Sequence, residues 1–347
     1  MLEFSEVSLE ELVVHKVGNK LQEEGISLSK EPVKIADEEI NGLLLRYFLA
    51  PFKGAESYVF HHEAGLDLHE VYTFASRIFE EPDRFYDQSV NLAKHLYEQS
   101  MHHKVKGGEL YVTLLRNVVA DGELVDALGL FKSETKDTFL KVNPAGENFD
   151  ISSDSGIDVK KLDKGCLILN TNREDGYRVF IVDTSNRQEA AYWKTDFLQL
   201  QPRQDNYHHT QHYLNLCKSF ATEHLPKEFE ATRADEIDLL NKSAKYFKEK
   251  DDFDLNDFTM EVLPQADMAD AFKDYKKQYQ REHALEFRDE FVISEAAVKK
   301  GGKVFKSVLK LDKNFHVYIH GNRELIERGF DDAQGMNYYK LYFTKEE

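Results

Sequence analysis

The sequence has few cysteines and no long apolar run. Only two cysteines, Cys166 and Cys217, occur in its 347 residues. Two isolated thiols give neither a disulfide framework nor the paired spacing of a zinc site, so we expect both to be buried. No run of about 18 apolar residues occurs, which excludes a transmembrane helix. The first six residues, MLEFSE, lack the basic and apolar regions of a signal peptide, and we expect a cytoplasmic protein with no membrane partner.

Positive charge is outnumbered by negative charge. The chain has 45 Lys and Arg against 63 Asp and Glu, a formal net charge of −18. Binding to nucleic acid depends on cations that neutralise phosphates, so this balance excludes a protein that coats nucleic acid with its whole surface. Any contact with DNA must be local and strongly dependent on salt. The sequence also lacks a Walker A loop, a dinucleotide-binding glycine loop and a serine-esterase elbow, and we predict no cofactor.

Apolar residues make up 41% of the chain, which is enough to form hydrophobic cores. Their spacing follows a helical period in one part of the chain and a strand period in another. Up to about residue 100 the period is mainly helical, with helices predicted at 38–50, after Asp67, and at 85–99. After Gly107-Gly108 the period becomes that of strands, with Asp121-Gly122 as a strong hairpin signal. We predict an α+β fold with a central antiparallel sheet flanked by helices. The expected strands of that sheet are 110–119, 124–132, 135–142, 166–170 and 177–182.

The polar segment 202–206 is rich in turn-forming residues and marks a soft boundary. Residues 207–283 are almost wholly helical in pattern, with apolar stripes at three- and four-residue spacing. A short strand, a short helix, a hairpin and an aromatic strand at 336–343 are expected after them. We therefore predict an N-terminal α+β domain at 1–200 and a mainly helical C-terminal domain at 201–347 that ends in a basic hairpin.

One stretch of the second domain, residues 291–322, inverts the sign of the charge. Six lysines face only two acids there, Glu295 and Asp312. Apolar residues typical of strands lie on both sides of the segment 311–314, whose Asp and Asn favour a tight reversal, so we predict a β-hairpin. Outward lysines would make it a cationic ribbon suited to phosphates, and protection of an edge strand is the alternative interpretation. The lysines predicted to contact DNA are Lys299, Lys300, Lys303, Lys306, Lys310 and Lys313.

A second basic cluster lies between Gly156 and Gly165, which permit the backbone to turn. We predict that its three lysines grip the backbone of the same duplex, and a solvated loop is the alternative. No helix-turn-helix, zinc finger or aromatic RNA-binding signature is recognisable, so nothing predicts readout of base sequence. Any preference among DNA molecules is expected to be for shape. The residues of this cluster are Lys160, Lys161 and Lys164.

Three segments occur in a characteristic order: GLFKSE from Gly129, GIDVKKLDKGCLILN from Gly156 and VFKSVLKLDKNFHVYIH from Val304. Together they resemble the bacterial nucleoid-associated protein family typified by NdpA and YejK. The likeness covers nearly the whole chain. It implies a cytoplasmic protein of the nucleoid that binds double-stranded DNA, and it carries over no catalytic residue. We predict a non-enzymatic protein that contacts the phosphate backbone of DNA without strong sequence specificity.

Two alternatives to that function stay open. One is an adaptor that reaches the nucleoid through a protein partner. The other is a metal-dependent nuclease, because Asp126, Glu134 and Lys136 have the outline of acids that hold a divalent cation and a lysine that stabilises phosphate charge. The same Glu-x-Lys spacing on a strand equally predicts a surface ion pair.

Histidine and aromatic pairs give weaker signals. His208 and His212 are four residues apart and can share a helix face, but the usual third ligand is missing nearby, so we predict no metal site. The pairs Tyr192-Trp193 and Tyr338-Tyr339 fit either an interface or ordinary core packing. A homodimer stays open as an alternative, because symmetry would put two cationic hairpins on one duplex.

Overall fold

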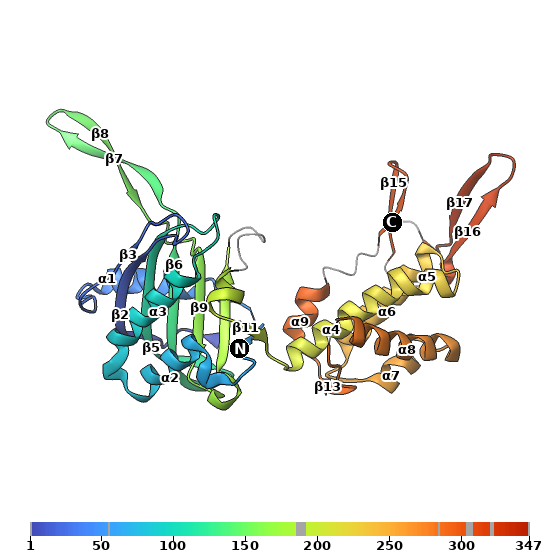
Figure 1. The fold of residues 1–347 in the computed structure, drawn as a ribbon. Coiled ribbons are helices and arrows are strands. Elements are labelled where there is room, and N and C mark those ends of the chain that lie inside the picture. Colours follow the sequence, from blue (N-terminus) through green and yellow to red (C-terminus); the bar gives the residue numbers. More distant parts are fainter. Residues whose placement is uncertain are drawn as a thin grey trace. The chain divides into compact units, whose positions relative to one another are not determined.

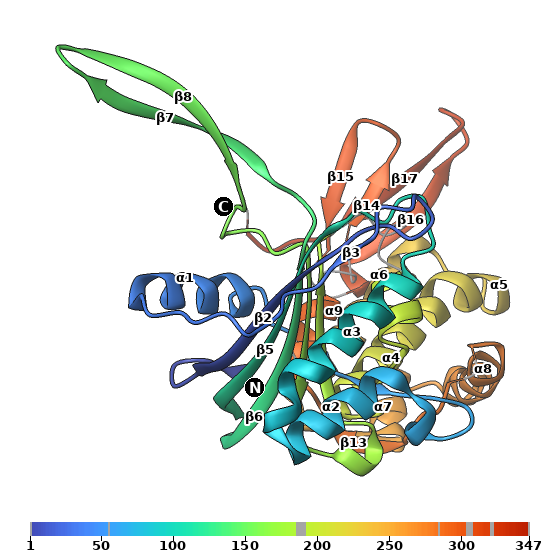
Figure 2. The ribbon, with the colours of Figure 1, turned by 60° about the vertical axis from the view of Figure 1, so that its left-hand side comes forward.

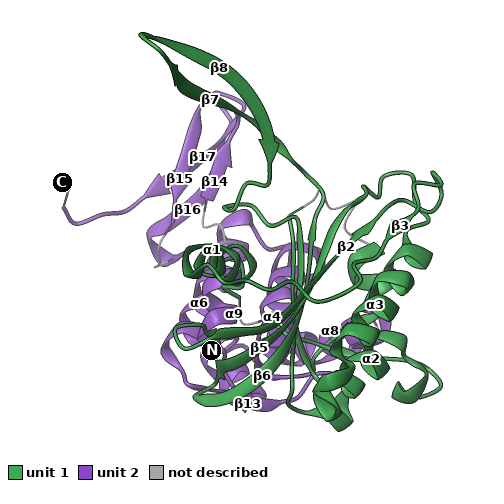
Figure 3. Ribbon diagram, turned by 90° about the vertical axis from the view of Figure 1, so that its left-hand side faces the viewer, with its two compact units in different colours: residues 1–203 green, residues 204–347 purple. Residues whose placement is uncertain are grey.

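The chain folds into two compact units, residues 1–203 and 204–347, here called unit 1 and unit 2 (Figures 1 and 3). The computed structural model describes residues 2–54, 56–184, 192–283, 285–302, 308–319 and 323–345. The fold is α+β with a large antiparallel sheet, which confirms the predicted class. None of the helices within these ranges is long and apolar enough to cross a membrane.

An antiparallel sheet of nine described strands forms the centre of unit 1 (Figure 1). Its order is β11-β4-β10-β9-β6-β5-β2-β3, and β1 pairs with β5. The prediction of about five strands was too small: four of the predicted strands join this sheet, the ten-residue β2 was not assigned to it, and the four strands of two or three residues leave little pattern in the sequence. The bounds are β1 Leu2–Glu3, β2 Ser8–Val17, β3 Ile26–Ser27, β4 Tyr58–Phe60, β5 Gly108–Ala120, β6 Glu123–Ser133, β9 Lys164–Leu169, β10 Arg178–Asp183 and β11 Leu200–Pro202.

Helices cover both faces of this sheet (Figure 3). On one face α2 (Glu70–Glu80) and α3 (Phe85–Gln99) enclose the larger apolar core of the unit. On the other face lies α1 (Glu38–Leu49), whose Phe48 stacks on Phe131 of β6 with ring centroids 4.3 Å apart. Because β6 and β9 are buried on both sides, their sequences are nearly continuous apolar runs.

The β5–β6 hairpin forms as predicted. Asp121 and Gly122 connect the strands with φ angles of 51° and 89°, as a two-residue turn of type I′ requires. The next strand departs from prediction: β7 (Asp137–Ala145) does not join the central sheet. It pairs only with β8 (Asn148–Gly156), a strand that was not predicted, and the two form a separate hairpin that projects from unit 1 (Figure 2).

Unit 2 is mainly helical, and its core is rich in aromatic rings. Phe253, for example, lies with its ring centroid 4.1 Å from that of Tyr213 and 4.9 Å from that of Phe291. A two-stranded sheet of β12 (Asp252–Asp254) and β13 (Glu290–Val292) joins distant parts of this core. The helices are α4 Asn206–Ser219, α5 Leu225–Glu228, α6 Arg233–Glu249, α7 Leu255–Val262, α8 Ala266–His283 and α9 Glu295–Gly301.

Two hairpins rise from one side of unit 2 (Figure 1). The first consists of β14 (Val308–Leu311) and β15 (Phe315–Tyr318), and the second of β16 (Ile326–Asp331) and β17 (Met336–Leu341). Their bases pack in a small apolar cluster with residues of α6. Both hairpins are therefore anchored on a single helix.

Candidate nucleic-acid interface

Helix α9 carries the first two predicted lysines. Its N-cap residue is Ser294, whose side-chain oxygen accepts a hydrogen bond from the Ala297 N–H. Lys299 and Lys300 lie exposed in its last turn, where cations interact favourably with the negative end of the helix dipole. The Lys300 ammonium also lies 5.7 Å from the centroid of the Tyr207 ring. These lysines thus stabilise their own helix and present charge at the surface.

The β14–β15 hairpin places one basic face outward. In its register Leu309 lies opposite Val317, and Lys310 lies opposite His316. Leu309 is buried against α6, whereas Lys310, His316 and the neighbouring Tyr318 are exposed on the other face. The predicted separation of apolar and basic faces holds only in part: Ile319 and Val317 pack in the cluster at α6 and Lys310 faces outward, but Val308 shares the face of Lys310 and Phe315 is 64% exposed.

The reversal of this hairpin adds another cation. Asp312 adopts a φ of 51°, a left-handed conformation that Asp tolerates better than most residues, and it begins the turn. Lys313 is exposed in the same turn. Two further predicted contacts, Lys303 and Lys306, lie outside the described residues.

The second predicted cluster divides into an exposed and a buried part. Lys160 and Lys161 are exposed in a turn, where the Lys160 N–H donates to the Asp158 carboxylate. Lys164 differs from the prediction of a surface contact, because its side chain is 1% exposed. Its ammonium donates to both carboxylate oxygens of Asp183, each at 3.1 Å. The strand that carries it is covered on both faces, so a phosphate backbone has no access to this lysine.

Lys164 belongs to a buried polar network that the sequence did not reveal. The Lys132 ammonium donates to Glu134 at 2.9 Å, to the Tyr192 hydroxyl at 3.0 Å and to the backbone carbonyl of Lys106 at 2.6 Å. The Tyr192 hydroxyl in turn donates to Glu134 at 2.7 Å. Burial lowers the pKa of Lys132, and the Glu134 carboxylate opposes that shift. All three ammonium protons of Lys132 have acceptors, so the network is a structural one.

This arrangement separates the residues of the nuclease alternative. Glu134 is held by Lys132 and Tyr192, Lys136 pairs with Glu109 at 2.6 Å, and Asp126 pairs with Arg116. Asp126 and Glu134 lie near opposite ends of β6, so their carboxylates do not converge on one cation. Among the described residues, no group of three or more His, Cys, Asp or Glu side chains has a geometry that could hold a metal ion.

The histidine pair does lie on one helix face. The rings of His208 and His212, in the first half of α4, have centroids 3.7 Å apart. Burial is the main cause that lowers the pKa of His212 to about 4, and the neighbouring His208 adds to it. His61, His62, His102 and His103, the other histidine pairs of the sequence, belong to unit 1.

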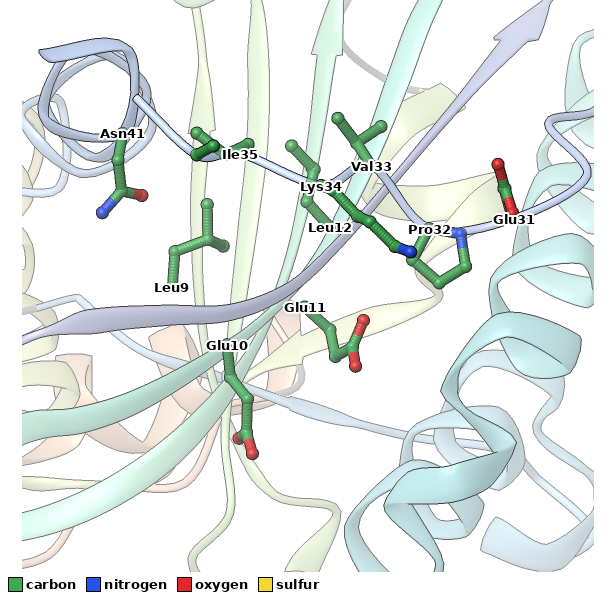
Figure 4. Close-up of a pocket in the computed structure, with 11 residues that line it drawn as sticks. Leu9, Glu10, Glu11, Leu12, Glu31, Pro32, Val33, Lys34, Ile35 and Asn41 are labelled. Carbon is green, nitrogen blue, oxygen red and sulfur yellow. The ribbon is translucent and has the colours of Figure 1, made fainter. Parts of the chain in front are cut away.

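Two pockets of the described chain have acidic linings. A pocket of about 500 Å³ lies beside β2, where Glu10, Glu11 and Glu31 face a single lysine, Lys34 (Figure 4). A second pocket, of about 360 Å³, lies in unit 2 and includes two aspartates and a glutamate against one lysine in its lining. Neither lining attracts phosphates, so the basic residues of α9 and the β14–β15 hairpin are the better candidates for a nucleic-acid interface.

One protein-family model matches a range of the chain that includes most of both units. The family described as "Nucleoid-associated protein YejK" matches residues 13–338. The chain belongs to this family. The matched range runs from β2 to β17 and includes the β7–β8 hairpin, α9 and the β14–β15 hairpin. A search of curated proteins found no match.

As a member of the YejK family, the chain is a nucleoid-associated protein, and the nucleoid is its place in the cell. The resemblance predicted from sequence is therefore confirmed. Sequence reasoning missed the exposed His316 and Tyr318 beside Lys310, although strand alternation from Lys310 across the turn could have found them.

Proposed function

We propose that this chain is a non-enzymatic DNA-binding protein that contacts the phosphate backbone through α9 and the β14–β15 hairpin. The observation that carries the proposal is the outward face of that hairpin. Lys310 and His316 lie side by side there, with Tyr318 next to them and Lys313 at the tip. Flexible ammonium groups suit phosphate contacts, and an exposed aromatic ring suits contact with sugars and bases.

The chemistry of these groups favours positioning over sequence readout. Readout of bases needs several polar side chains fixed against base edges, whereas lysines bind phosphates as point charges. The described hairpin offers two lysines of that kind on a short ribbon. We therefore propose binding without strong sequence specificity, to which Lys160 and Lys161 of unit 1 add phosphate contacts.

The proposal predicts a specific change in the salt dependence of binding. Lys310→Gln together with Lys313→Gln should weaken binding to a fluorescent duplex and lower the slope of log K against log salt by about 0.9 for each phosphate that the variant no longer neutralises. Fluorescence anisotropy over a salt series measures both quantities. Wild-type binding should itself weaken as salt rises, because each lysine–phosphate contact releases counterions from the duplex.

A matched control distinguishes the hairpin from net charge. Lys245→Gln together with Lys248→Gln removes the same two charges from exposed positions on α6. This control should keep the wild-type slope. Equal slopes for the hairpin variant and the wild type would contradict the proposed contacts, and absence of binding by the wild type at low salt would contradict DNA binding itself.

The adaptor alternative has one observation in its favour. The β16–β17 hairpin exposes Phe330 and Met336 near its tip, and apolar side chains at a surface favour contact with another protein. Phe330→Ser together with Met336→Ser should leave DNA affinity unchanged if the chain binds DNA directly. Loss of nucleoid localisation in cells by this variant, without loss of DNA affinity, would favour the adaptor.

The absence of catalysis is part of the proposal and has its own test. The same binding mixtures, prepared with magnesium and analysed on a gel, should contain intact duplex. Cleavage that depends on magnesium and persists after repurification would overturn the non-enzymatic part of the proposal. Binding without cleavage supports it.

A further inference from the structure

The β7–β8 hairpin, called the arm below, has two chemically different faces. Its register pairs Leu140 with Ser153, Val142 with Ile151, and Pro144 with Phe149. Because strand residues alternate between faces, these six side chains share one face with Thr138 and Ser155. No residue on that face is charged. The opposite face carries all the charged strand residues of the arm: Asp137, Lys141, Asp150 and Asp154.

The uncharged face is open to water. Leu140 is 72% exposed, Val142 62%, Phe149 73% and Ile151 66%. Every residue of β7 is exposed, and so is every residue of β8 except the last. On the charged face, the Lys141 ammonium donates to the Asp154 carboxylate at 2.6 Å. One face of the arm is thus polar and suited to contact with water, whereas the other is apolar and suited to packing against another protein surface.

An isolated two-stranded hairpin is at best marginally stable in water, and it becomes stable when its apolar face packs against another layer. We infer that a second copy of this chain supplies that layer, with the apolar faces of two arms packed against each other. A second copy is present whenever the chain is synthesised. The same partner is thus available wherever this apolar face is exposed.

Charge favours this occupant over DNA. The arm carries four acids, including Glu147 in its turn, against one lysine, so a duplex would be repelled. Two arms related by a twofold axis bring identical uncharged faces together and leave both charged faces in water. The contact is self-complementary, and no carboxylate is buried by it.

The geometry also sets the strength of the dimer. Strands of nine residues are about 30 Å long, and two packed sheets lie about 10 Å apart, so two arms form a small four-stranded sandwich. One face two strands wide offers a few hundred Å², against about 800 Å² per partner in a standard interface. We expect a dimer that dissociates on dilution. This inference does not rest on DNA binding.

Sedimentation velocity of the DNA-free protein over a wide range of concentration tests it. The wild type should pass from monomer to dimer as concentration rises. Leu140→Asp together with Ile151→Asp places four carboxylates in the apolar contact of the pair, so the dissociation constant should rise by at least about a hundredfold. Trp193 is buried in the core of unit 1, and its unchanged fluorescence would show that this core is folded in the variant.

A matched control adds the same charges to the same arm. Ala145→Asp together with Ser152→Asp alters the charged face, where residue 152 lies opposite Lys141, and should keep the wild-type dissociation constant. A folded Leu140→Asp, Ile151→Asp variant that still dimerises like the wild type would overturn the inference. A monomeric wild type would also overturn it and would leave another macromolecule as the occupant of the apolar face.

Cross-linking gives a second readout. Both natural cysteines are buried, and burial raises the pKa of Cys217 to about 12, so neither reacts readily. Val142→Cys introduces one accessible thiol at the middle of the apolar face. A short bismaleimide should join two copies through it, whereas the same reagent should leave a Ser152→Cys variant largely monomeric. Equal cross-linking of the two variants would count against the face-to-face arrangement.

Discussion

Replacing Lys132 by methionine is expected to lower the free energy of unfolding of unit 1 by about 3–5 kcal/mol, because it removes one partner of a buried ion pair. The methionine fits the space, but the Glu134 carboxylate loses its ammonium donor at 2.9 Å and stays only 7% exposed. The ammonium of a second buried lysine, Lys164, lies 4.0 Å from the Glu134 carboxylate, but it already pairs with Asp183. Urea unfolding followed by the fluorescence of Trp193 measures the change.

A surface pair provides the control. Lys136→Met breaks a pair with Glu109, but Lys136 is 51% exposed, so the expected destabilisation is below about 1 kcal/mol. The double variant Lys132→Met with Glu134→Leu removes both charges and should be more stable than Lys132→Met alone. Equal destabilisation by Lys132→Met and Lys136→Met would contradict the buried network.

Local signals in the sequence predicted the elements whose ends depend on local chemistry. The helix at 38–50 was predicted, and the carboxylate of Asp37 caps its start by accepting hydrogen bonds from the N–H groups of Glu39 and Ile40. The helix at 85–99 has the predicted ends. In both cases the apolar spacing lies within the element itself, so a single stretch of sequence contains the information.

The arm shows where such signals end. Residues 135–142 alternate like any half-buried strand, and the sequence correctly predicted a strand there. Its partner, however, is β8 and not β6, and the choice of partner depends on contacts that local alternation does not specify. Gly146, with a φ of 64°, is the one local sign of a reversal after β7. A reversal at Gly146 could therefore have been predicted from the sequence, although the pairing of β7 with β8 alone could not.

The candidate site could be predicted only in part for a related reason. Lys160, Lys161 and Lys164 look alike in the sequence, but Lys164 is buried because its acceptor, Asp183, lies on the neighbouring strand β10. A burial that depends on a partner 19 residues away does not appear in local composition. Lys310 was predictable because its outward direction follows from the two-residue period of its own strand.

Acidification is expected to destabilise unit 1 through His69. This ring is fully buried; its Nδ1 accepts a hydrogen bond from the Tyr72 N–H, and its Nε2 donates to the Leu198 carbonyl, each at 3.1 Å. That pattern requires the neutral ring, and burial lowers its pKa to about 4 from an ordinary 6.5. Between these values the unfolded chain binds a proton that the folded chain does not. The contribution of His69 to stability is therefore complete above pH 6.5 and falls by about 1.4 kcal/mol per pH unit towards pH 4.

His69→Asn should remove this part of the pH dependence while it retains an acceptor for the start of α2, because Asn is a good N-cap residue. Urea unfolding at a series of pH values, followed by Trp193, should give the variant a flatter profile than the wild type between pH 6.5 and pH 4. At neutral pH the variant should be less stable, since the Leu198 carbonyl loses a donor. His61→Asn, at an exposed ring, is the control and should keep the wild-type profile. If His69→Asn kept it as well, another buried group would be the source of the acid sensitivity, and His15, whose pKa burial also lowers, would be the next residue to replace.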